Sequence, residues 1–84
     1  MNKKVTIYST PTCHYCRAAK EFFKERHVAF EEHNVATDAA RRKEMVDKSG
    51  QLGVPVITVS DQDGRNESLV IGFDEPQLGK LIGI

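Results

Sequence analysis

Short runs of apolar residues predict four β-strands along this chain. In residues 3–8, Val5 and Ile7 fall on one face of an extended chain, and Thr6 and Tyr8 fall on the other. Further runs of this kind occupy residues 28–35, 54–59 and 67–71. A turn signal (Asp-Gln-Asp-Gly) at residues 61–64 separates the last two runs, so these two strands are expected to form a hairpin.

Helical spacing of apolar residues predicts three helices. Between residues 14 and 27, four side chains fall on one helical face with charges opposite them: Cys16, Ala19, Phe22 and Phe23. A second helix is expected from a cap at position 37 or 38 to about Ser49, and its thin apolar stripe places it on the domain surface. Asp74 is expected to cap a third helix that has Pro76 in its first turn.

The order of these elements, βαβαββα, restricts the possible sheet. The first strand–helix–strand crossover is expected to be right-handed, which makes the first two strands parallel. The hairpin then adds antiparallel pairing. The sequence therefore predicts one α/β domain over residues 1–84, with a four-stranded mixed sheet and helices on both faces.

Composition narrows the class of protein. Twelve basic and twelve acidic side chains give a formal net charge of zero, which argues against a general nucleic-acid binder. No apolar run approaches the roughly 20 residues that span a bilayer, which argues against a membrane protein. The apolar stretch after the basic N-terminus covers only Val5 to Ile7, too short for a signal peptide. We therefore expect a cytoplasmic protein, and a monomer.

The most specific motif is Cys13-His14-Tyr15-Cys16, which follows the first strand and begins the first helix. Unpaired N–H groups and the helix dipole favour a thiolate at Cys13. Cys16 lies one turn further, on the same face, within reach of a disulfide and less exposed. We expect Cys13 to be the nucleophile and Cys16 the resolving thiol. His14 and Tyr15 are candidates for tuning the site.

A metal site is the competing interpretation of the two cysteines. A closed zinc site needs four ligands and this motif supplies two. His27 and His33 lie at the ends of the second strand and are expected on the surface. No metal is therefore expected within one chain. An iron–sulfur cluster shared by two chains, or an adaptor that uses the fold only for binding, remain as alternatives.

Two further segments have both a structural and a functional interpretation. Pro55 either begins the third strand or forms a cis peptide that faces the dithiol and leaves the Val54 backbone free to pair with an extended substrate. Gly72-Phe73-Asp74 either forms a turn and a helix cap or offers backbone N–H groups to a carboxylate. The residues alone favour neither reading of the second segment.

Taken together, these residues resemble the glutaredoxin family over nearly the whole chain. The resemblance consists of the Cys13–Cys16 motif, residues 41–45 with Ser49-Gly50, the Val54-Pro55 pair and Gly72-Phe73-Asp74. It implies a thioredoxin-like fold in its smallest form, which matches the predicted element order. It also implies that Pro55 is cis.

The resemblance further implies a glutathione site beside Cys13. Val54 would pair with the cysteine backbone of glutathione. Gly72, Phe73 and Asp74 would hold its γ-glutamyl end. Arg42 stands where the family often has a basic residue near the glycyl carboxylate.

Three departures from the family pattern bear on the electron donor. His14 replaces the common proline, Gly53 replaces the usual threonine, and Thr10 replaces a lysine that helps to hold glutathione. Such changes are similar to those in redoxins reduced by a thioredoxin-reductase-type flavoprotein. The expected function is that of a dithiol thiol–disulfide oxidoreductase acting in electron transport and cell redox homeostasis. It would reduce protein disulfides or mixed glutathione disulfides, with glutathione as co-substrate. A flavoprotein reductase is the alternative donor, and a metal or iron–sulfur carrier is the alternative function.

Overall fold

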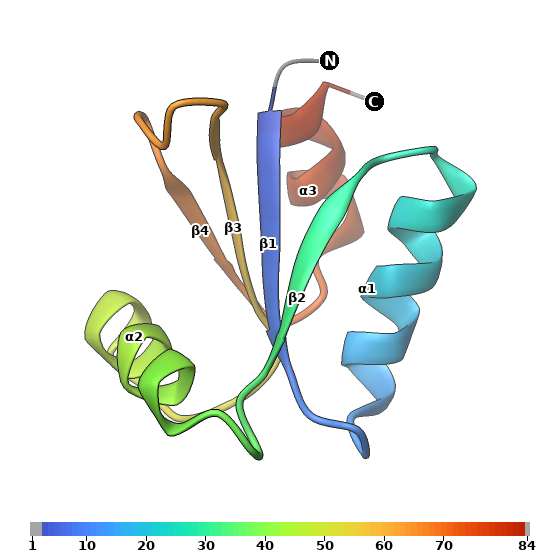
Figure 1. Cartoon of the computed structure of the whole chain (residues 1–84). Coiled ribbons are helices and arrows are strands. Elements are labelled where there is room, and N and C mark those ends of the chain that lie inside the picture. Colours follow the sequence, from blue (N-terminus) through green and yellow to red (C-terminus); the bar gives the residue numbers. More distant parts are fainter. Residues whose placement is uncertain (1–2, 84) are drawn as a thin grey trace.

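The computed structural model describes residues 3–83, whose strands and helices follow the order that the sequence predicts (Figure 1). The elements are β1 (Lys3–Ser9), α1 (His14–Glu25), β2 (Phe30–Asn34), α2 (Ala39–Ser49), β3 (Val56–Asp61), β4 (Ser68–Ile71) and α3 (Glu75–Ile82). Residues 1, 2 and 84 of the expected domain lie outside the described part. Within residues 3–83, no helix has both the length and the apolar character needed to cross a bilayer.

The end of α1 and the start of β2 differ from the prediction. Helix α1 ends at Glu25, and the chain then reverses through His27, which has a left-handed φ of 58°. The Val28 N–H donates to the Phe23 carbonyl oxygen at 2.8 Å, so Val28 belongs to the end of the helix. Strand β2 therefore begins at Phe30 and not at residue 28.

The start of β3 also differs, whereas the helix caps are confirmed. Strand β3 begins at Val56 and not at Val54, because Pro55 has no N–H to donate to the strand ladder. The side chains of Asp38 and Asp74 accept hydrogen bonds from the first turns of α2 and α3, at 3.0 and 3.2 Å. These two carboxylates fix where the helices begin.

The sheet has the strand order β2-β1-β3-β4. Strands β1 and β2 are parallel, whereas β1 pairs with β3 and β3 with β4 in antiparallel fashion. The predicted mixed sheet is confirmed. Its topology brings the last residues of β1 and β4 and the first residues of β3 to one end of the sheet. This end lies at the bottom of Figure 1.

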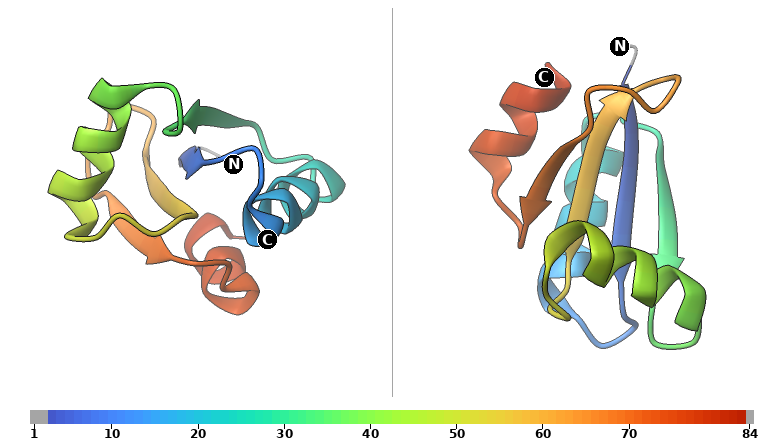
Figure 2. Two further views of the ribbon diagram at one scale, coloured as in Figure 1. Left: turned by 90° about the horizontal axis from the view of Figure 1, so that it is seen from below. Right: turned by 90° about the vertical axis from the view of Figure 1, so that its left-hand side faces the viewer.

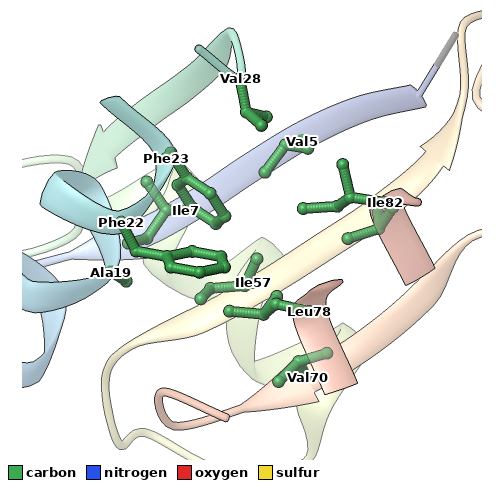
Figure 3. Close-up of a cluster of buried hydrophobic side chains, with 11 residues drawn as sticks. Val5, Ile7, Ala19, Phe22, Phe23, Val28, Ile57, Val70, Leu78 and Ile82 are labelled. Atoms are coloured by element: carbon green, nitrogen blue, oxygen red, sulfur yellow. The ribbon is translucent and has the colours of Figure 1, made fainter. Parts of the chain in front are cut away.

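Helices α1 and α3 cover one face of the sheet, and α2 lies on the other (Figure 2). The face under α1 and α3 holds the larger apolar cluster, which comprises Val5, Ile7, Ala19, Phe22, Phe23, Val28, Ile57, Val59, Val70, Leu78 and Ile82. Figure 3 shows the Phe22 and Phe23 rings and the Leu78 side chain gathered over the strands. This cluster fixes the position of α1 relative to the sheet, because each of these side chains is removed from water.

The face under α2 is apolar only at one end. Its cluster consists of Tyr8, Val35, Met45 and Val56. Met45 is the buried residue of α2, which agrees with the predicted thin apolar stripe. Further along the strands, a hollow of about 300 Å³ opens between α2 and the sheet, with Thr6, Thr58 and Ser60 among its lining residues.

Tyr8 anchors α2 to this face. Its hydroxyl group donates a hydrogen bond to Glu44, whose carboxylate also accepts from Arg41 at 3.2 Å. The expectation that His33 lies on the surface is met only in part, because its side chain is partly buried, 18% exposed. Strand register pairs His33 with Tyr8, and the two rings meet edge to face with centroids 5.5 Å apart. His27, in contrast, is exposed as predicted.

Candidate functional site

Three loops meet at the lower end of the sheet. One carries the dithiol between β1 and α1, one carries Pro55 before β3, and one carries residues 72–74 after β4. The strand directions require this meeting, since β1 and β4 end where β3 begins. The left view of Figure 2 looks at this end of the molecule. Pro55 and residues 72–74 thereby come close to a dithiol that lies some 40 to 60 positions earlier in the sequence.

Cys13 occupies the N-cap position of α1. Its Sγ accepts a hydrogen bond from the Cys16 N–H at 3.1 Å, and its own N–H donates to the Thr10 carbonyl oxygen at 3.3 Å. A sulfur atom in this position caps unpaired helix N–H groups, and the positive end of the helix dipole favours negative charge on it. The geometry makes Cys13 suited to react as a thiolate.

The two thiols differ in exposure, as predicted. Both are free, but Cys13 is partly exposed whereas Cys16 is only 1% exposed. The pKa of Cys16 is raised to about 12, first by burial and then by its hydrogen bond with Cys13. A thiol with such a pKa is protonated at neutral pH. An external disulfide therefore meets Cys13 first.

The residues between the cysteines face solvent. Tyr15 is 68% exposed and His14 is also exposed, so both lie on the rim of the site. Among residues 3–83, no group of three or more histidine, cysteine or acidic side chains is placed to hold a metal ion.

The Val54–Pro55 peptide bond is cis, as the family resemblance implies. Pro55 is buried and its carbonyl oxygen accepts from the Gly72 N–H at 2.9 Å, which ties the second loop to the third. Gly72 adopts a φ of +81°, which favours glycine. Within residues 3–83, neither the N–H nor the carbonyl group of Val54 forms a hydrogen bond. Val54 therefore presents an unpaired peptide group beside the cis bond.

The segment after Gly72 forms the predicted turn and cap. Asp74 is exposed and caps α3, whereas the Phe73 ring is half-buried and packs edge to face against Phe22 at 5.8 Å between centroids. The Phe73 side chain thus belongs to the apolar cluster. Asp74, in contrast, remains exposed at this end of the sheet.

Arg42 stands apart from the other candidates. It lies on α2, across the sheet from α1, and makes no hydrogen bond to any of them. Its neighbours Arg41 and Lys43 pair with Glu44 and Asp47 at 3.2 and 2.9 Å. Among residues 3–83, Arg42 itself has no ion-pair partner. Its guanidinium group is free to meet an external anion.

Sequence reasoning missed three polar residues behind the dithiol. Lys20 Nζ and Ser9 Oγ both donate to the same Glu32 oxygen, each at 2.7 Å. Glu32 is a charged residue within the apolar run of residues 28–35, so the pattern alone gives it no role. The available signal was the spacing of Lys20, four residues after Cys16 and hence on the same side of the helix.

Comparison with known proteins identifies relatives that cover most of the chain. A glutaredoxin family model matches residues 5–63. An uncharacterized glutaredoxin-like 8.6 kDa protein in a rubredoxin operon of Clostridium pasteurianum is 42% identical over 78 residues, which make up 93% of this chain and 96% of that protein. Glutaredoxin 3 of Escherichia coli (strain K12) is 40% identical over 58 residues, 69% of this chain and 70% of that protein. Among solved structures, the NrdH-redoxin from Escherichia coli superposes with a TM-score of 0.75 at 26% identity, over 93% of each chain. It is described as a glutaredoxin-like protein with a thioredoxin-like activity profile.

Proposed function

Because the chain belongs to the glutaredoxin family of thiol–disulfide oxidoreductases, we propose that it reduces protein disulfides and mixed glutathione disulfides through Cys13 and Cys16. The observation that carries the proposal is the asymmetry of the dithiol. Cys13 is a partly exposed helix N-cap whose sulfur accepts the Cys16 N–H, whereas Cys16 is buried one turn further. We infer that the protein acts in the reducing cytoplasm, where both thiols are regenerated after each cycle.

The cycle has two exchange steps. The Cys13 thiolate attacks one sulfur of the substrate disulfide, forms a mixed disulfide and releases the first thiolate, which takes a proton from water. Cys16 then loses its proton and attacks the Cys13 sulfur. The Cys13–Cys16 disulfide forms, and the remaining substrate sulfur leaves with the bonding electron pair. The substrate is reduced and the dithiol is oxidised.

Glutathione is the proposed electron donor. The unpaired Val54 peptide group suits an extended peptide backbone, and the unpaired Arg42 guanidinium suits a carboxylate. Asp74 and the backbone of Phe73 lie where the γ-glutamyl end would sit by family resemblance. The 40% identity to glutaredoxin 3 supports the same donor.

A flavoprotein reductase is the second candidate donor. Thr10 stands in place of the lysine that the family commonly uses to hold glutathione, and its backbone carbonyl is engaged by the Cys13 N–H. The likeness to the NrdH-redoxin extends over 93% of both chains. Both observations favour a thioredoxin-reductase-type flavoprotein as the alternative electron donor.

One assay tests both the chemistry and the donor. NADPH consumption is followed with a protein disulfide substrate, either with glutathione and glutathione reductase or with thioredoxin reductase. We expect turnover with the glutathione system, and Cys13→Ser to lower it at least about a hundredfold. Cys16→Ser should accumulate a mixed disulfide on Cys13, visible by mass spectrometry. Activity retained in Cys13→Ser contradicts the proposed chemistry, and turnover only with thioredoxin reductase contradicts glutathione as donor.

Arg42→Met tests the glutathione site itself. Loss of a charge that contacts the glycyl carboxylate should raise the KM for glutathione about 3- to 10-fold while kcat stays unchanged, since that contact is the same in the ground and transition states. Lys43→Met is the matched control, because Lys43 is an exposed cation on the same helix that already pairs with Asp47. Equal KM values in the two variants contradict a role for Arg42.

A further inference from the structure

Lys20 lies one helical turn after the resolving cysteine on α1. Residues four apart on a helix are surface neighbours, with Cβ atoms about 5–6 Å apart, so Lys20 follows Cys16 on one side of α1. Its ammonium group is held against the sheet, because the side chain is partly buried, 27% exposed, and Nζ donates to Glu32 on β2 at 2.7 Å.

Glu32 and Ser9 hold this ammonium group in place. Ser9, only 1% exposed at the end of β1, donates its hydroxyl group to the same Glu32 oxygen at 2.7 Å. The hydrogen bond from Lys20 and then that from Ser9 lower the pKa of Glu32, so the carboxylate is ionised at neutral pH. The positive charge of Lys20 is thereby fixed between α1 and the sheet.

The resolving step needs a thiolate at Cys16, where burial opposes charge. The pKa of Cys16 is raised to about 12 by burial first, and Cys13 adds to this through its hydrogen bond and its charge. Two groups act in the opposite direction: a hydrogen bond with the Thr10 backbone and the positive charge of Lys20. Once Cys13 is part of a mixed disulfide, its charge is gone. The rise in the pKa of Cys16 caused by burial is then opposed by the Thr10 backbone and the charge of Lys20.

We propose that Lys20, held by Glu32 and Ser9, is a positioning residue whose fixed charge stabilises the developing Cys16 thiolate and so accelerates the resolving step. The inference rests on the proposed function, in which Cys16 attacks the mixed disulfide at Cys13. In that step the Cys16 thiol gives its proton to water and the Cys13–Cys16 bond forms. The bond from Cys13 to the substrate sulfur breaks, and that sulfur leaves as a thiolate. Lys20 exchanges no atom or electron. Its charge lowers the free energy of the thiolate.

A chromogenic disulfide separates the two steps in one experiment. Stopped-flow reaction of the reduced protein with 5,5′-dithiobis(2-nitrobenzoate) releases one coloured thiolate when Cys13 attacks, and a second when Cys16 resolves the mixed disulfide. Lys20→Met keeps most of the apolar stem and removes the charge. We expect the second phase to slow about tenfold at pH 7 and its pH dependence to move to higher pH, while the first phase changes less.

Two further variants make the result specific. Lys20→Arg keeps the charge and should resolve within about twofold of the unmodified protein. Lys24→Met removes an exposed charge one turn further along α1 and should leave the second phase unchanged. A second phase in Lys20→Met that matches Lys24→Met at every pH overturns the role of Lys20. If Cys13→Ser still releases the first thiolate at the normal rate, the proposed function itself is wrong. Thermal unfolding of Lys20→Met within a few degrees of the unmodified protein shows that its rate change is not a loss of folding.

Discussion

The two faces of the sheet are held to their helices by different forces. Under α1 and α3, the contact is an apolar cluster of eleven side chains that includes Phe23 and Ile57, both 0% exposed. Under α2, the apolar contact is confined to a few residues at one end around Met45. Polar contacts supply the rest, through the Tyr8–Glu44 hydrogen bond and an ion pair of 3.0 Å between Lys48 and Glu67.

This difference divides the site into a fixed and an adjustable part. The dithiol stands at the start of α1, so its position is set by close-packed apolar contacts that tolerate little displacement. Arg42 stands on α2, whose polar contacts lie partly in water and contribute less per contact. The chemistry thus belongs to the rigid face, and the proposed recognition of glutathione belongs in part to the softer one.

Two neighbours on β3 test the contrast most strongly. Ile57 points into the large apolar cluster and Thr58 lines the polar hollow on the other face. Ile57→Thr buries an unpaired hydroxyl group and loses apolar surface, so the free energy of unfolding should fall by about 2–4 kcal/mol. Thr58→Val should change it by less than about 0.5 kcal/mol, since the two side chains have nearly the same shape and Thr58 lines a polar hollow outside the large apolar cluster. Urea unfolding followed by circular dichroism measures both. Similar losses in the two variants contradict the division between the faces.

The apolar face is also the part of the fold that the sequence predicts best. The spacing of Cys16, Ala19, Phe22 and Phe23 identifies α1 and its buried side, because a continuous apolar stripe leaves one helical interpretation. The position of Cys13 at the helix start follows from the same pattern. Local rules of capping and periodicity are sufficient here.

The polar contacts cannot be predicted from the same local rules. Glu32 interrupts an apolar pattern, and its partners Ser9 and Lys20 come from β1 and α1, so parallel strand pairing must be known before they can be joined. The sequence predicts a surface position for His33, because a lone polar residue carries no sign of its partner. Its partial burial depends on the register with Tyr8, which only the folded sheet defines.

Tyr8→Phe probes the adjustable face with a smaller expected effect. The variant removes the hydrogen bond to Glu44 and nothing else of the ring, so the free energy of unfolding at pH 7 should fall by about 1 kcal/mol, a value reduced by the partial exposure of Glu44. Tyr15→Phe is the matched control, because Tyr15 is 68% exposed and the same change there should have no measurable effect.

The pH dependence of the stability lost in Tyr8→Phe shows whether this loss comes from the hydrogen bond or from packing of the ring. The hydrogen bond from Tyr8 has the largest effect on the pKa of Glu44 and lowers it; burial opposes this, and the hydrogen bond from Arg41 lowers the pKa further. A carboxyl group with a lowered pKa in the folded state stabilises the protein above its unfolded pKa of about 4.3, and this stabilisation is lost as the pH falls through the lower folded value. The difference in free energy of unfolding between the unmodified protein and Tyr8→Phe should therefore be full at pH 7 and shrink below about pH 4. We call this difference the stability gap. At the alkaline end, burial first and Glu44 second raise the pKa of Tyr8, so the stability gap should also narrow as the pH rises above about 10. Urea midpoints of both proteins across this range give the curve. A stability gap that stays constant from pH 7 to pH 3 assigns the loss to packing of the Tyr8 ring and removes the electrostatic distinction between the two faces.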